Sequence, residues 1–415
     1  MPSPHLAMQP ASRNEELEGV VWPATRGRAH PPDRIGASGV SALRDYDLGH
    51  VRAGQRTALQ FFVWSRLIAW ILAAGTLTFF RSSLNPERYR WDRPRIHDLG
   101  SIIDIWARWD SDWYVQIAQH GYVWPSARPA FFPLYPLLVG GLGHVLGGHY
   151  VLAGVLVSLV AGAFAFVLFF RLAELKLGES TASRATFFLA IFPTTLFFGA
   201  VYSESLFLLL SVAAFLLAER GQFRLAGLAT GLATLTRPVG LALIPALAIL
   251  AWRSPDKRRS LVGVAIAPAL FSLYPLVLWI WLGHPLAFLT AQSGIWRRHL
   301  SVYGPLGGFV EGFSQHAAKD VAVAAVLVFL AGVAWRKLGA AYGTYAFASL
   351  LLPLMWPSDT HALWSISRFG VVLFPIVFAL ASLTRHRVVA AVVSLALVAW
   401  CVDSVVKWAL WYWVA

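Results

Sequence analysis

The chain has 415 residues, of which 57% are hydrophobic and 13% are charged, and its mean hydropathy is +0.60. This composition excludes a soluble globular enzyme of this length and indicates a polytopic membrane protein. The formal net charge of +13 does not indicate nucleic-acid binding, because the basic residues lie mostly in the N-terminal segment and in short loops between apolar runs. The single cysteine, Cys401, excludes an intramolecular disulfide framework and a cysteine-built metal site.

The N-terminal segment is polar. Residues 1–56 contain several arginines and prolines and have no sustained apolar period, so we expect a disordered cytoplasmic tail. The segment also lacks the apolar stretch of a cleavable signal peptide, which predicts that the first apolar run is a retained helix. Residues 57–415 are expected to form one transmembrane domain.

Apolar segments fill most of that domain. The runs 149–170 and 260–282 contain no Asp, Glu, Lys or Arg. At 1.5 Å per residue, about 20 such residues cross a bilayer core of about 30 Å. Twelve apolar segments are found, at about 58–80, 130–148, 149–171, 183–200, 203–219, 222–236, 239–252, 260–282, 320–335, 339–356, 368–384 and 387–411.

Basic loops between these segments predict the orientation, because Lys and Arg accumulate on the cytoplasmic side. A cytoplasmic N-terminus agrees with this rule only if the segment 130–148 does not cross the membrane. Its two prolines and several glycines suit a re-entrant or interfacial hairpin. The result is an all-α polytopic membrane protein with about 11 transmembrane helices and an external C-terminus. Three loops are then expected outside: 81–129, 283–319 and 357–367.

The first external loop contains "WARWDSDWY" at 106–114. If residues 102–119 form one helix, apolar and polar side chains sort onto opposite faces, which predicts an amphipathic helix at the membrane surface. On its polar face, Arg108 is four positions from both Asp104 and Asp112 and could pair with either.

Asp110 differs from these acids because the same helix places it within the apolar stripe. An ionised carboxylate there needs a partner or a water-filled cavity. Two interpretations remain open. Asp110 is a general base that faces a cleft, with Asp112 structural, or Asp110 forms a structural salt bridge with a residue such as Arg237.

Further charges lie near the expected outer surface. Glu204 follows Tyr202 in "AVYSESLFLL", where a helix cap is the alternative to a functional role. Arg237 in "LTRPVGL" suits a phosphate or a carboxylate, and its alternative is an ion pair with Glu204 or Asp110.

Two more basic motifs lie in the later loops. Arg297 and Arg298 in "WRRHL" deviate from the positive-inside trend, which favours an anionic ligand, with phosphate the obvious candidate. In "WPSDTHALWSISRFG" His361 and Arg368 precede a span, and the histidine alone is more typical of a structural or solvent-exposed residue than of a catalytic one.

The order of these motifs resembles that of the PIG-V-like mannosyltransferases, the family of the second mannosyltransferase of GPI anchor synthesis and its bacterial relatives. The resemblance covers about residues 106–384, and neither the tail nor the last span shares it. The motifs that carry it are "RWDSDWYVQIAQHGY", "AFFPLYPLL", "AVYSESLFLLLS", "ATLTRPVGL" and "SRFGVVLFPIVFALA".

The resemblance implies a GT-C-type helical bundle with a catalytic acid in its first external loop. The family's WD aspartate falls on Asp110, its serine–glutamate pair on Ser203 and Glu204, and its arginine on Arg237. The turn after that arginine reads Pro238-Val239-Gly240 here and departs from the family pattern.

The implied activity is transfer of mannose from a polyprenyl-phosphate-linked donor to an acceptor hydroxyl on the outer face, with inversion to an α-mannoside. Asp110 is then the catalytic base, and external arginines stabilise the leaving phosphate. The substrate-binding candidates are Trp109, Asp112, Tyr114, Tyr202, Glu204, Arg237, Arg297, Arg298, His361 and Arg368. The sequence requires no cofactor, and it leaves open whether a divalent metal takes part.

The expected partners are the donor and a lipid, glycan or protein acceptor. Another polyprenyl-phosphate sugar, such as glucose or arabinose, is an alternative donor. A transporter or lipid flippase is an alternative of another class, but the charges collect at the outer rim and no clear internal repeat is present, which favours surface catalysis. The alanine-, arginine- and tryptophan-rich composition indicates a high-GC bacterial source and therefore the plasma membrane.

Overall fold

Helices account for the regular structure of the chain between residues 37 and 414, which are the residues that the computed structural model describes. No strand is present in this range, and the one isolated β-bridge joins Arg298 and Ser358. The expected all-α class is therefore confirmed for the described residues.

Five helical stretches are long and apolar enough to cross a membrane. A sixth candidate is a pair, α16 (Ile366–Val372) and α17 (Phe374–Leu383), bent by 81°. The five are Ala53–Phe79 in α1 (Ala37–Phe79), α5 (Tyr150–Leu177), Lys257–Leu282 formed by α10 (Lys257–Val264) and α11 (Ile266–Leu282), α14 (Ala318–Leu338) and α18 (Arg387–Ala409).

Shorter helices complete the bundle, so the expected number of about 11 spans is not confirmed. With at most 16 residues each, these helices are shorter than the roughly 20 residues that a perpendicular crossing needs. They are α6 (Glu179–Ala190), α7 (Glu204–Glu219), α8 (Phe223–Thr234), α9 (Leu243–Trp252) and α15 (Ala340–Met355).

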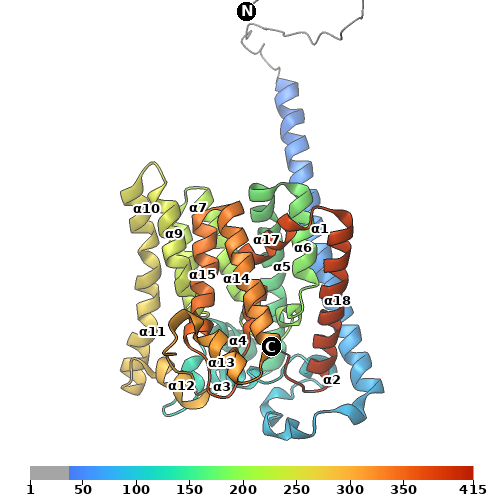
Figure 1. Cartoon of the computed structure of the whole chain (residues 1–415), viewed down its shortest axis with the longest axis vertical. Coiled ribbons are helices and arrows are strands. Elements are labelled where there is room, and N and C mark those ends of the chain that lie inside the picture. The colour runs from blue at the N-terminus through green and yellow to red at the C-terminus, as the bar shows by residue number, and fades with distance from the viewer. Residues whose placement is uncertain (1–36, 415) are drawn as a thin grey trace, which may run out of the picture. The chain divides into compact units, whose positions relative to one another are not determined.

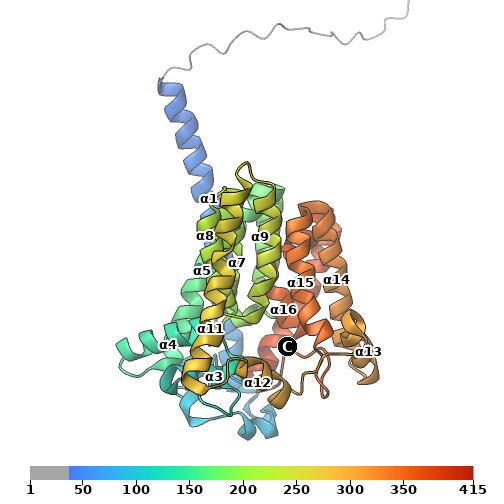
Figure 2. The ribbon, with the colours of Figure 1, turned by 90° about the vertical axis from the view of Figure 1, so that its left-hand side faces the viewer.

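One end of the bundle collects the long loops. The helices α2 (Ser101–Asp104), α3 (Ser111–His120), α12 (Ala287–Ile295) and α13 (Gly307–Ser314) all lie there, whereas α10 lies at the opposite end (Figures 1 and 2). The helix α4 (Leu134–Val145) lies beside α3 at the loop end, and its 12 residues extend only about 18 Å. This length agrees with a segment that does not cross, although it forms a helix and not a hairpin.

The expected N-terminal tail needs a correction. Residues 37–56 belong to α1, whose helix begins at Ala37. This part of the sequence contains no proline, so nothing prevents the helix from extending beyond its apolar span. Residues 1–36 of the expected tail lie outside the described residues.

The predicted single helix over 102–119 is wrong. The chain leaves the helix after Asp104 and re-enters it at Ser111, and Trp109 between them has a φ of +52°. A left-handed conformation at a bulky residue costs about 1 kcal/mol and is incompatible with a continuous right-handed helix. The predicted ion pairs of Arg108 do not form: Asp112 pairs with Arg95 instead, and no salt bridge joins Arg108 to Asp104.

Candidate active site

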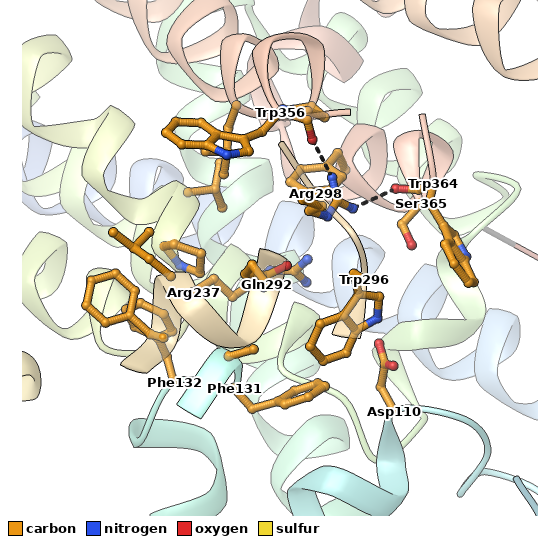
Figure 3. A pocket seen from close by; sticks show the side chains of 18 of the residues that line it. Asp110, Phe131, Phe132, Arg237, Gln292, Trp296, Arg298, Trp356, Trp364 and Ser365 are labelled. Carbon is orange, nitrogen blue, oxygen red and sulfur yellow. Dashed lines mark hydrogen bonds between the residues drawn. The ribbon is translucent and has the colours of Figure 1, made fainter. Parts of the chain in front are cut away.

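A cavity of about 850 Å³ opens at the loop end of the bundle. Aromatic and aliphatic side chains form most of its wall, and four charged residues reach it. These are Asp110, Arg237, Arg298 and Arg368. They come from the α2–α3 turn, the α8–α9 connection, the loop after α12 and α16, so distant parts of the chain converge here. Figure 3 shows Asp110 facing this space together with Trp296 and Trp364.

Asp110 lies at the start of α3, directly after the strained turn. Its carboxylate Oδ2 accepts a hydrogen bond of 2.8 Å from Nη1 of Arg368, and 19% of its side chain is exposed. The Tyr202 hydroxyl fixes the turn, because it accepts from the Asp110 amide and donates to the Arg108 carbonyl, each at 3.1 Å. Asp110 is thus held at its backbone while its carboxylate faces the cavity.

Glu204 lies behind Asp110 and is completely buried at the start of α7. Its Oε1 forms an ion pair with Nη1 of Arg237 and a second one, at 2.8 Å, with Nε of Arg368. Its Oε2 has no hydrogen-bond partner among the described residues. Glu204 therefore fixes two arginines at once. From the sequence, its role had remained open between a helix cap and a functional residue.

Arg368 and Arg237 also contact aromatic rings. The Arg368 guanidinium lies 5.2 Å from the centroid of Tyr202 and 5.5 Å from that of Phe197, while Arg237 lies 5.7 Å from that of Phe369. Such contacts favour a charged guanidinium in a poorly hydrated place. The side chains of both arginines are at most 10% exposed.

Arg298 forms no salt bridge in the described part of the chain. It donates to the backbone carbonyls of Trp356 at 3.0 Å and Trp364 at 3.4 Å (Figure 3). Burial lowers the pKa of Arg298 to about 10, and the nearby charge of Arg368 acts in the same direction. The guanidinium therefore stays charged at neutral pH, and its charge is available to an anion in the cavity.

Arg297 and His361 are not brought to the cavity. Arg297 has a φ of +48° and an exposed side chain, whereas its neighbour Arg298 lines the cavity. His361 is exposed and its ring packs against Trp364, with 4.9 Å between centroids. Neither residue is among those that line the cavity.

Asp112 also has a different environment from Asp110. Its Oδ1 accepts from Nε of Arg95 at 2.5 Å, and its Oδ2 accepts from the amide of Gln116 at 3.0 Å. It does not line the cavity. The structure thus separates the two acids, as the alternative with a structural Asp112 expects.

Asp104, another acid of the first loop, binds the backbone of its own loop. Its carboxylate accepts the backbone N–H groups of Asp98, Leu99 and Gly100 at 2.9–3.2 Å. Arg108 instead lies over Trp411, 4.1 Å from the ring centroid. Both residues stabilise the loop that carries Asp110.

The aromatic candidates divide into two groups. Trp109 and Tyr114 line the cavity, whereas Tyr202 is buried behind it. Burial, with the charge of Glu204 acting in the same direction, raises the pKa of Tyr114 to about 12, so its hydroxyl stays protonated beside Ser203 Oγ at 2.9 Å.

Sequence reasoning missed the C-terminal tryptophans. Trp413 lines the cavity and packs edge-on against Trp109, with 5.3 Å between ring centroids. The motifs that carry the family resemblance end before this segment. The density of tryptophan in "KWALWYWVA" at 407–415 was the available signal.

A metal site is not evident in the described residues, where no group of three or more His, Cys, Asp or Glu side chains could hold an ion.

Comparison with known proteins agrees with the resemblance found in the sequence. Residues 55–251 match the family model described as mannosyltransferase (PIG-V). The chain is also similar to GPI alpha-1,6-mannosyltransferase 2 of Rattus norvegicus, with 28% identity over 217 residues, and of Cricetulus griseus, with 32% identity over 209 residues. These alignments cover 48% and 46% of this chain and 43% and 41% of the relatives. The resemblance to the PIG-V-like family is confirmed over this region, and the chain matches less than half the length of these relatives.

Among solved structures, the oligosaccharyltransferase of Archaeoglobus fulgidus is similar. Its apo form has a TM-score of 0.41 at 13% identity and covers 85% of this chain and 56% of that chain. Its complex with Zn and sulfate has a TM-score of 0.40 at 15% identity and covers 84% and 53%.

Proposed function

We propose, from the match of residues 55–251 to the mannosyltransferase (PIG-V) family, that this chain is an integral-membrane glycosyltransferase. It transfers mannose from a polyprenyl-phosphate-linked donor to an acceptor hydroxyl at the loop end of the bundle, which is the external side. The observation that carries the proposal is the convergence of one carboxylate and three arginines on a cavity with a mainly apolar wall.

The wall suits a donor with a lipid tail. Phe271, Phe288 and Leu241 line the part of the cavity formed by α11, α12 and the η6 turn (Pro238–Ala242). Burial of an isoprenoid chain against such side chains is favourable by about 25 cal/mol per Å² of apolar surface. The volume of about 850 Å³ lies within the usual range for small-molecule sites, roughly 300–1,000 Å³.

The charged residues suit the chemistry of the transfer. Asp110 takes the proton from the acceptor hydroxyl as its oxygen forms a bond to C1 of the sugar. The bond from C1 to the phosphate oxygen breaks, and its electron pair stays on the phosphate. Arg237, Arg298 and Arg368 stabilise the charge that develops there. In-line attack on a β-linked donor yields an α-mannoside.

The test is mannose transfer from synthetic polyprenyl-phosphate mannose by the purified protein in liposomes with a panel of lipid, glycan and peptide acceptors. A labelled mannoside product, formed in preference to products from the glucose and arabinose donors, supports the proposal. Transfer of glucose or arabinose alone would show that the donor sugar is not mannose. Movement of the donor across the bilayer without any product would show that the protein is a lipid transporter and not a transferase.

A further inference from the structure

The segment from Trp408 to Val414 lies against the turn that presents Asp110. It begins in the last turn of α18 and lies entirely outside residues 55–251, which match the family model. The side chains of Trp408, Trp411 and Val414 are buried in the same apolar cluster as Ile105 and Trp106. The two segments are thus packed together although about three hundred positions separate them.

Three residues of the turn, Ile105, Arg108 and Trp109, contact this segment. The indole of Trp408 donates to the Ile105 carbonyl at 2.8 Å. Arg108 lies over the ring of Trp411, and Trp109 packs edge-on against the rings of Trp411 and Trp413 at 6.0 and 5.3 Å between centroids.

The segment is itself fixed to the first loop. The Asn85 backbone N–H donates to the Leu410 carbonyl at 2.9 Å, and the Asn85 side-chain amide donates to the Trp411 carbonyl at 3.0 Å. The C-terminal segment thus connects the first loop, through Asn85, to the turn at Trp109, and this connection can hold the turn in place. The φ of +52° at Trp109 is unfavourable by itself, and such a conformation persists only where the surroundings impose it.

The contacts end at the cavity. Trp413 lines it beside Trp91, Trp109 and Trp364, and its ring lies edge-on to Trp364 at 6.2 Å. Trp364 in turn accepts from Arg298 through its carbonyl. Trp413 therefore lies between the turn that carries Asp110 and the loop that binds Arg298.

We propose that the side chain of Trp413 is a positioning element of the active site: it holds Trp109 in its left-handed conformation and thereby directs the Asp110 carboxylate into the cavity. The proposal rests on the proposed function, because positioning is measured here through transfer. A carboxylate displaced by about 1 Å can cost on the order of a hundredfold in rate.

The experiment compares Trp413→Ala, Trp413→Phe and the control Tyr412→Ala in the full chain in liposomes. Tyr412 is the adjacent residue and 40% of it is exposed, so its truncation leaves the packing around Trp109 intact. We expect kcat to fall at least tenfold in Trp413→Ala with KM for the donor changed less than threefold. Trp413→Phe should recover most of the rate, and Tyr412→Ala should match the wild type.

A second measurement separates positioning from folding. Thermal unfolding in detergent reports the folded fraction, and kcat is expressed per folded molecule. The double variant Trp413→Ala with Trp109→Ala should show non-additive losses, since the two rings touch. Wild-type transfer with unchanged kcat in Trp413→Ala would overturn the proposal, as would a loss explained entirely by unfolding. Absence of transfer in the wild type would instead count against the proposed function.

Discussion

Asp110 Oδ2 lies 2.8 Å from Nη1 of Arg368, a residue 258 positions later in the chain. This contact joins the first long loop to α16 and closes one side of the cavity. Arg368 also pairs with Glu204, and Glu204 pairs with Arg237, so four charges of alternating sign follow one another. Asp110, Arg368 and Arg237 line the cavity, and Glu204 is buried behind them.

Replacing the proposed base should abolish transfer. We expect Asp110→Asn to lower kcat by about 10²–10⁴, because the amide cannot take the hydroxyl proton. The matched control is Asp112→Asn, whose side chain contacts Arg95 and Gln116 outside the cavity and whose variant should retain most of the rate. The measurement is mannose transfer per folded protein. Equal activity of both variants would exclude Asp110 as the base.

Removing the charge of Glu204 should destabilise the fold. Glu204→Gln leaves two largely buried guanidinium groups without their shared carboxylate, and loss of one partner from a buried pair typically costs about 3–5 kcal/mol. Glu219→Gln is the control, since Glu219 pairs with Lys176 at a more exposed position and should cost about 1 kcal/mol. Thermal unfolding in detergent checks both. A similar Tm for the two variants would show that the Glu204 pairs contribute little.

The adjacent arginines after α12 should behave differently. Arg298→Ala removes an available positive charge from the cavity, so KM for the donor should rise about 10- to 150-fold, corresponding to the roughly 1.5–3 kcal/mol of a hydrogen bond to a charged group. Arg297→Ala should leave KM unchanged, because that side chain is exposed and does not line the cavity. Initial rates at varied donor concentration distinguish them. A larger effect of Arg297→Ala would contradict the assignment of Arg298.

The turn after Arg237 should not tolerate a side chain. A Cβ at Gly240 would lie 2.7 Å from backbone atoms of Ala233 and Thr234, so Gly240→Ala must displace η6 from α8. We expect a loss of about 1–3 kcal/mol, the usual cost of overpacking, together with lower transfer because Arg237 precedes this turn.

The control for this substitution is Gly141→Ala in α4. This glycine is exposed, and nothing lies within 4 Å of an added Cβ. Its replacement should stabilise the helix by about 0.5–1 kcal/mol. Unfolding temperatures that fall equally in both variants would refute the steric explanation.

Sequence reasoning found Asp110 but explained its position incorrectly. The composition around 106–114 identified the acid, and the family motif assigned it a role, yet the helical wheel missed the turn at Trp109. That turn depends on contacts with Trp411 and Trp413. No local pattern of residues 102–119 contains this information.

The arginines show the same limit. Arg297 and Arg298 are adjacent and equivalent in sequence, yet only Arg298 lines the cavity. An ion pair of Arg237 with Glu204 or Asp110 was the alternative to an anion-binding role, and the structure forms the pair with Glu204. The sequence identified Arg368 as a candidate but did not predict its partners, Asp110 and Glu204. Pairing between residues hundreds of positions apart depends on how the whole bundle packs.

The alternating charges Arg237, Glu204, Arg368 and Asp110 sum to zero. An anion that enters the cavity can approach Arg368 only in competition with a carboxylate, whereas Arg298 is in no salt bridge with a described residue. A phosphate would therefore meet Arg298 first and exchange places with Asp110 on Arg368 afterwards. Under the proposed function, such an exchange would free the Asp110 carboxylate, and we then expect the donor to bind before the acceptor.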